Sequence, residues 1–145
     1  MNLSIYQSHL DNTPKQYRVV RLFRPPIYII ELSNNQLIAV CYYKDGSSKR
    51  YQINADFSNR RMVIADFNKF TKALAELLKK FPRHFLWVSA LASIDVTETL
   101  ADGLTNIEFK VITEAFFVGA VQAKRRILHS TVSYQGQIVP LEKFG

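Results

Sequence analysis

The sequence predicts an α/β (α+β) fold with a mixed sheet, and three observations predict it. Residues 27–53 contain three short apolar runs separated by polar turns, which is typical of a three-stranded antiparallel meander. Apolar residues then recur every three or four positions from Phe67 to Phe81, which indicates an amphipathic helix. Beyond Pro82 the pattern indicates alternating strands and helices. A chain of 145 residues, 48% of them hydrophobic, is long enough to bury one core.

The meander is predicted from β-branched runs and turn residues. A buried strand is expected over Ile27–Leu32, and its return strand over Gln36–Tyr43. Ser33–Asn35 supplies the first turn, because asparagine tolerates a positive φ. The Asp-Gly pair within Lys44–Ser47 predicts a second hairpin turn before a third strand over Lys49–Ile53.

The second half of the chain predicts helices and strands in alternation. A helix capped by Asp66 or Asn68 is expected to run to Lys80 and to stop before Pro82. The remaining expected elements are a strand over His84–Leu91, a short helix from Asp95 or Thr97 to Gly103, a strand over Phe109–Ile112 and a helix over Glu114–Leu128. The order β-β-β-α-β-α-β-α is that of the ribonuclease-H-like topology, which actins, sugar kinases and many nucleases share.

The Pro25-Pro26 pair and the changes in hydrophobic periodicity divide the chain into three predicted segments. Residues 1–25 are expected to form an N-terminal arm that ends at Pro25-Pro26, and its first 13 residues, which show no clear period, are expected to be loose. Residues 26–128 are expected to form one domain. Residues 129–145 are expected to form a C-terminal tail with a small hairpin near Gln135-Gly136.

Charge and cysteine content indicate the cellular environment of the protein but not its activity. The net charge of +7 and the pI of about 9.6 fit an anionic partner, but the excess is spread over the chain, as on a solvated basic surface. One cysteine, Cys41, allows no internal disulfide and fits a reducing compartment. Neither a secretory leader nor a membrane-spanning run is recognised, so a cytoplasmic location is expected.

Three stretches carry a resemblance to a known family. Ile30–Val40 has the pattern of a strand, a polar turn and a strand; Met62–Phe67 precedes a helix; and Val111–Val121 has the pattern of a strand running into a helix with small residues. In this order, over roughly residues 27–127, they resemble the rod-shape actin (MreB) family of bacteria. The resemblance implies one half of an actin-like fold, in which the first turn would contact phosphate and the strand-to-helix junction would position the attacking water.

The departures from the family pattern imply that this chemistry is lost. Glu31 stands where the family has aspartate, Ser33 where it has glycine, and Asn34 where it has threonine. The resemblance makes these residues, with Asn35 and Glu114, vestigial positions of a nucleotide site. The second half that would clamp the nucleotide is not recognised in the sequence. We therefore expect no catalytic residues, no cofactor and no bound metal.

A different activity on the same topology is a metal-dependent nuclease or a nucleic-acid-binding module. A two-metal nuclease needs clustered carboxylates. The candidates are Glu31 and Glu114, with Asp66 and Asp95 as companions. The three histidines share no metal-ligand spacing.

The function expected from the sequence is non-enzymatic protein binding. The partner would be an actin-like filament or a second copy of the chain, and the resemblance links the process to cell shape or envelope assembly. The arm between Gln16 and Arg24 alternates basic and apolar residues. Its candidate partner-binding residues are Tyr17, Arg18, Arg21, Phe23 and Arg24.

Overall fold

The computed structural model describes residues 3–11, 22, 24–59, 62–82, 90–98, 103–125, 127–135 and 137–138. These residues contain a six-stranded mixed sheet in the order β3-β2-β1-β4-β5-β6. The strands are β1 (Ile27–Ser33), β2 (Gln36–Tyr42), β3 (Ser48–Asn54), β4 (Ala90–Val96), β5 (Ile127–Tyr134) and β6 (Gln137–Ile138). β1, β2 and β3 form an antiparallel meander, whereas β4 runs parallel to both β1 and β5. The predicted fold class, a mixed sheet opened by a three-stranded meander, is confirmed.

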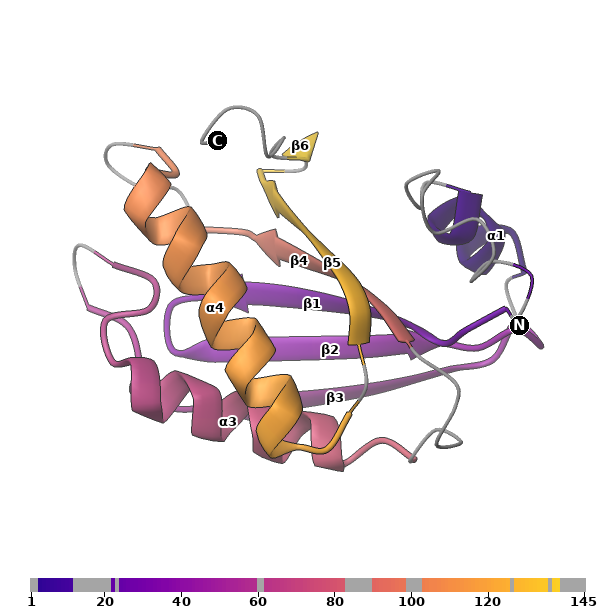
Figure 1. Cartoon of the computed structure of the whole chain (residues 1–145), viewed down its shortest axis with the longest axis horizontal. Helices are drawn as coiled ribbons and strands as arrows, with labels where there is room; N and C mark the ends of the chain where they lie inside the picture. Colours follow the sequence, from indigo (N-terminus) through magenta and orange to yellow (C-terminus); the bar gives the residue numbers. More distant parts are fainter. Residues whose placement is uncertain are drawn as a thin grey trace.

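Two helices cover one face of this sheet. These are α3 (Phe67–Lys79) and α4 (Asn106–Gln122), which lie beside each other in Figure 1. Alternate residues of β1 point toward them, because successive side chains of a strand point to opposite faces. Tyr28, Ile30 and Leu32 are buried in the core that α3 and α4 share with the sheet.

The first helix of the core begins where the sequence predicts. Asp66 is the N-cap of α3, and its carboxylate accepts a hydrogen bond from the backbone N–H of Lys69 at 3.0 Å. The buried side chains of this helix recur at steps of three and four residues, as an amphipathic helix requires. The helix ends at Lys79, just before Pro82.

The prediction of a strand over Phe109–Ile112 is wrong, because these residues lie inside α4. The hydroxyl of Thr105 caps this helix by accepting a hydrogen bond from the backbone N–H of Glu108 at 3.2 Å. The predicted strand-to-helix junction at Glu114 therefore does not exist. The apolar run has the pattern of a buried strand, but it belongs to a 17-residue helix that buries Phe109 and Ile112 and leaves Lys110 exposed.

The fourth strand also lies later in the chain than expected. β4 runs from Ala90 to Val96, so it extends beyond the predicted strand over His84–Leu91, and residues 84–89 of that prediction lie outside the described residues. The predicted helix start at Asp95 is wrong, since Asp95 is inside β4. Thr97 continues the pairing, because its N–H donates to the carbonyl of Leu32 at 3.0 Å. Residues 99–102 of the predicted short helix lie outside the described residues.

Part of the predicted loose arm is a packed helix. α1 (Leu3–Asp11) lies at the end of the sheet where β1 and β4 begin (Figure 1). Its Tyr6 and Leu10 are buried in a small cluster with Ile27 and Leu91, separate from the main core. The hydroxyl of Tyr6 donates to the carbonyl of Pro25 at 2.7 Å, which ties the helix to the residue before the sheet.

The sheet continues beyond the residue at which a tail was expected. β5 extends to Tyr134, pairing with β4 through Ser130–Tyr134, so residues assigned to the tail are sheet residues. The small hairpin predicted near Gln135-Gly136 is confirmed, because Ser133 pairs with Ile138 in antiparallel register.

Candidate functional site

The turn between β1 and β2 is the place where the resemblance puts a phosphate. Ser33 and Gln36 close it as register partners, with Asn34 and Asn35 between them. Asn35 has φ 57°, the left-handed conformation that asparagine tolerates. The predicted hairpin is therefore confirmed.

The amides of this turn are hydrogen-bonded within the chain. The N–H of Asn34 donates to the Glu98 carboxylate at 3.0 Å, and the N–H of Asn35 donates to the hydroxyl of Ser58 at 3.0 Å. The Asn35 side chain in turn accepts from the N–H of Ser58 at 2.8 Å. A phosphate on this turn would have to displace the Glu98 carboxylate and then lie beside its negative charge. The turn is thus closed by residues that the sequence did not single out.

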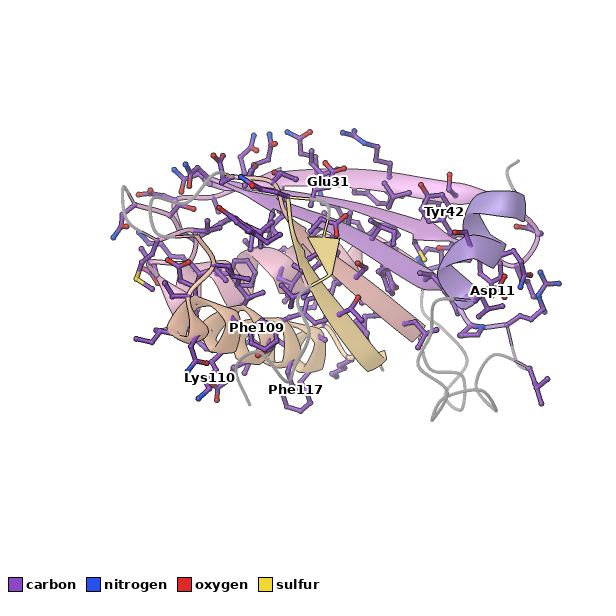
Figure 2. All side chains as sticks on the ribbon, turned by 90° about the horizontal axis from the view of Figure 1, so that it is seen from above. Asp11, Glu31, Tyr42, Phe109, Lys110 and Phe117 are labelled. Carbon is purple, nitrogen blue, oxygen red and sulfur yellow. The ribbon has the colours of Figure 1, made fainter. Side chains whose placement is uncertain are left out.

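The two glutamates expected near the nucleotide lie on opposite sides of the sheet. Glu31 is an exposed residue of β1 whose neighbours Ile30 and Leu32 point into the core, so Glu31 points away from the helices. Glu114 is an exposed residue of α4, which covers the other face. Figure 2 shows Glu31 on the side of the sheet away from α4. These two carboxylates therefore cannot share a metal ion or a substrate.

A closer pair of carboxylates exists on the open face, but it lacks further ligands. Glu31 and Asp95 are register partners on the parallel strands β1 and β4. Asp95 accepts a hydrogen bond from the hydroxyl of Ser133 and a longer one, at 3.5 Å, from Ser93. Asp66 instead caps α3. No group of three or more potential metal ligands occurs among the residues that the structure describes.

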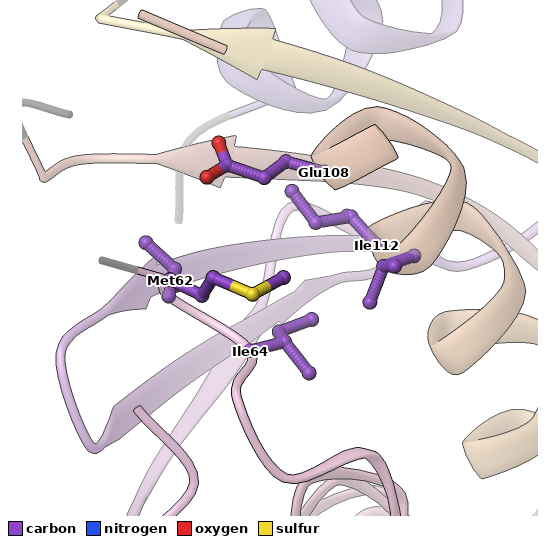
Figure 3. A pocket seen from close by; sticks show the side chains of 6 residues that line it. Met62, Ile64, Glu108 and Ile112 are labelled. Atoms are coloured by element: carbon purple, nitrogen blue, oxygen red, sulfur yellow. The ribbon is translucent and has the colours of Figure 1, made fainter. Parts of the chain in front are cut away.

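One cavity, beside the start of α4, is too small for a nucleotide. It has a volume of about 10 Å³, and its lining residues are Met62, Val63, Ile64, Glu108, Val111 and Ile112. Figure 3 shows Met62 and Ile64 on one side and Glu108 and Ile112 on the other. Such a volume is close to that of a single water molecule.

The single cysteine does not provide a nucleophile. Cys41 is fully buried in β2, on the core side of the sheet. Burial raises the pKa of its thiol from 9.0 to about 12. The reactive thiolate is therefore scarce at neutral pH.

Of the predicted partner-binding residues, the structure describes Arg24. Tyr17, Arg18, Arg21 and Phe23 lie outside the described residues. Arg24 is exposed, and its guanidinium lies 5.5 Å from the ring centroid of Tyr6. It therefore packs on α1 of its own chain.

An exposed face of α4, which we call the α4 stripe, was missed by the sequence analysis. Its members are Ile107, Lys110, Glu114, Phe117 and Val121, all exposed. They follow one another at steps of three or four residues, so they form one line along the helix. Three of them are large apolar residues, with Ile107 69%, Phe117 66% and Val121 58% exposed.

The sequence contains a pattern that could have predicted the helix carrying the α4 stripe. Thr105 and Glu108 form the Thr-x-x-Glu pattern of a capping box, which predicts a helix start before the apolar run. Once the helix begins there, apolar residues occur on all its sides, including the side that does not face the core. The false strand over Phe109–Ile112 concealed this pattern.

Comparisons with known proteins show no family. No protein-family model and no curated protein matches the chain. Among solved structures, it is similar to the crystal structure of ethanolamine utilization protein EutJ from Carboxydothermus hydrogenoformans, with a TM-score of 0.46 and 10% sequence identity. The similarity covers 80% of this chain and 50% of the EutJ chain, so the chain spans about half the length of that protein. The fold class rests on the strand order and directions given above.

No described helix is both long enough and apolar enough to cross a membrane.

Proposed function

We propose that this chain is a non-enzymatic protein-binding domain that binds its partner through the α4 stripe. The observation that carries this proposal is the exposure of Ile107, Phe117 and Val121 along one line of α4. Covering such side chains is favourable, at roughly 25 cal/mol for each Å² of apolar surface removed from water. A line of large apolar residues on a helix is a common way to bind another helix or a groove.

The non-enzymatic part of the proposal is supported by the closed β1–β2 turn. Phosphoryl transfer depends on backbone amides and cations held around the phosphates. Here the amides of Asn34 and Asn35 already have acceptors in Glu98 and Ser58. The Glu98 carboxylate also adds a negative charge where a phosphate would lie.

The biological setting is proposed from the resemblance alone. A domain similar to half of a rod-shape actin would bind an actin-like filament, or itself, in cytoplasmic machinery for cell shape or envelope assembly. A fold does not determine a function, so this setting is a separate claim from the binding surface.

Calorimetric titration with Mg-ATP tests the non-enzymatic claim. We expect no heat of binding, because the turn amides are occupied. A dissociation constant below about 100 μM, which corresponds to roughly 5.5 kcal/mol, would overturn the claim. The rate of ATP hydrolysis in the presence of the protein should equal the rate in buffer alone.

A quantitative pull-down tests the binding surface. Proteins captured by the wild-type chain should be lost with Phe117→Ser, because this change removes the most central apolar side chain of the α4 stripe. Phe67→Ser is the matched control, since it is the same change at an exposed phenylalanine (37%) at the start of α3, outside α4. Equal capture by both variants and the wild type would show that the α4 stripe is not the binding surface.

A further inference from the structure

The α4 stripe has an internal symmetry that indicates what covers it. Lys110 and Glu114 each lie two residues from Ile112 in the sequence, and Ile107 and Phe117 each lie five residues from it. The charged pair and the apolar pair are therefore centred on the same level of the helix. Two copies of the helix, placed antiparallel about a two-fold axis at that level, bring unlike members into opposition.

In this arrangement both the charged contacts and the apolar contacts are complementary. Lys110 of each copy faces Glu114 of the other, and Ile107 of each copy faces Phe117 of the other. Lys110 and Glu114 are exposed, and no ion pair joins them to each other. The two charges of one copy are thus available to the two charges of a second copy.

We propose that the α4 stripe is a homodimer interface in which two α4 helices pack antiparallel. This inference rests on the proposed protein-binding function and names its partner, a second copy of the chain. The site needs no strand or loop movement, because α4 lies on the outside of the helical layer. Figure 2 shows Lys110 and Phe117 pointing away from the sheet, on the side opposite Glu31.

The charges select the antiparallel orientation. In a parallel pair about a two-fold axis, Lys110 would face Lys110 and Glu114 would face Glu114, which is repulsive. A strongly acidic partner would leave Glu114 opposed by like charge, and a strongly basic partner would do so for Lys110. A second copy in antiparallel orientation opposes each charge with its opposite.

The size of the face sets the expected strength. A standard interface buries about 800 Å² on each partner, and a single helix stripe provides less. We therefore expect a weak dimer, with a dissociation constant of about 1 to 100 μM. Sedimentation velocity of the full chain between about 5 and 500 μM covers this range.

Charge reversal tests the pairing directly. Lys110→Glu places two glutamates opposite two glutamates in the dimer, and Glu114→Lys places two lysines opposite two lysines. Each variant alone should dimerise at least about 10-fold more weakly than the wild type. The double variant Lys110→Glu/Glu114→Lys restores opposite charges at both contacts and should dimerise like the wild type.

A mixture of the two single variants gives the most specific readout. Each mixed dimer has only opposite charges at its two contacts, so the mixture should associate when neither variant does alone. A role of these residues in the stability of the monomer would not produce this rescue. Circular dichroism of each variant checks that its helix content equals that of the wild type.

The outcomes separate this inference from the proposed function. If the wild type stays monomeric at all concentrations, or the mixture shows no rescue, the homodimer is wrong. If the same monomer still captures proteins that Phe117→Ser loses, the binding function stands with a different partner. If neither dimerisation nor capture depends on the α4 stripe, both proposals fall.

Discussion

At the scale of single residues, the β1–β2 turn shows how far local chemistry can be predicted. Asparagine at positions 34 and 35 predicts a turn with a left-handed residue, and Asn35 adopts it. The acceptor of the Asn34 amide is Glu98, 64 residues further along the chain. Turn propensity contains no information about such a distant acceptor. The turn was thus predictable, whereas its closure was not.

Gly119 determines how closely α3 and α4 approach. A Cβ atom at this position would lie 2.7 Å from Cδ2 and 3.1 Å from Cβ of Leu74, a fully buried residue. Gly119→Ala should therefore lower the free energy of unfolding by about 1 to 3 kcal/mol, even though alanine favours the helix. Urea denaturation of the wild type and the variant measures this difference.

A double variant serves as the control for Gly119→Ala. Leu74→Ala on its own leaves a cavity and is destabilising, but it also removes Cγ and Cδ2, the two atoms nearest to the new methyl group. Gly119→Ala/Leu74→Ala should then lose less stability than the sum of the two single changes. Strict additivity would contradict the contact between Gly119 and Leu74 as the reason.

At the scale of elements, the sequence of α3 has a recognisable helical pattern, whereas that of α4 resembles a strand. The polar and apolar positions of α3 separate onto two faces, so its period and its Asp66 cap were recognised. The sequence of α4 is apolar on every side and includes a β-branched run at Val111-Ile112, which resembles a buried strand. Local pattern alone does not separate a buried strand from a helix that has apolar residues on every side.

The cap of α3 leads to a prediction about this element. Asp66→Ala should lower the free energy of unfolding by about 1 kcal/mol, because the N–H of Lys69 loses its acceptor. The ion pair of Asp66 with Lys69, at 3.9 Å between exposed side chains, should contribute little. Thermal or urea unfolding measures the change.

Asp66→Asn distinguishes the cap from the ion pair. Asparagine keeps a side-chain oxygen for the Lys69 amide but has no charge, so its stability should stay close to that of the wild type. A loss with asparagine equal to the loss with alanine would assign the effect to charge and not to capping.

At the scale of the whole molecule, buried ionisable groups set the response to alkaline pH. Burial raises the pKa of Cys41 from 9.0 to about 12, and it raises the pKa of Tyr28 above its ordinary value of 10.0. Both groups are neutral in either state below about pH 8. As the pH rises further, the unfolded chain releases these protons and the folded chain keeps them. The free energy of unfolding should therefore be flat near neutrality and should fall from about pH 9 toward pH 12.

Urea midpoints measured in steps from about pH 7 to pH 10.5 test this response. Each fully buried group can contribute up to about 1.4 kcal/mol for each pH unit above its unfolded pKa. Cys41→Ala removes one group, so its stability should fall less steeply with pH, whatever its value at neutrality. Identical slopes for the two proteins would show that the Cys41 thiol does not contribute.

The sequence by itself determined the meander, its two turns, the capped helix α3 and the mixed character of the sheet. Each depends on residues that are neighbours in the chain, through β-branched runs, Asn or Asp-Gly turns and a cap next to its helix. Only the tertiary structure decided that Glu31 and Glu114 lie on opposite sides of the sheet and that Glu98 closes the turn. It also decided that one line of α4 stays exposed. These relations depend on strand register and on which face α4 covers, and local periodicity contains neither.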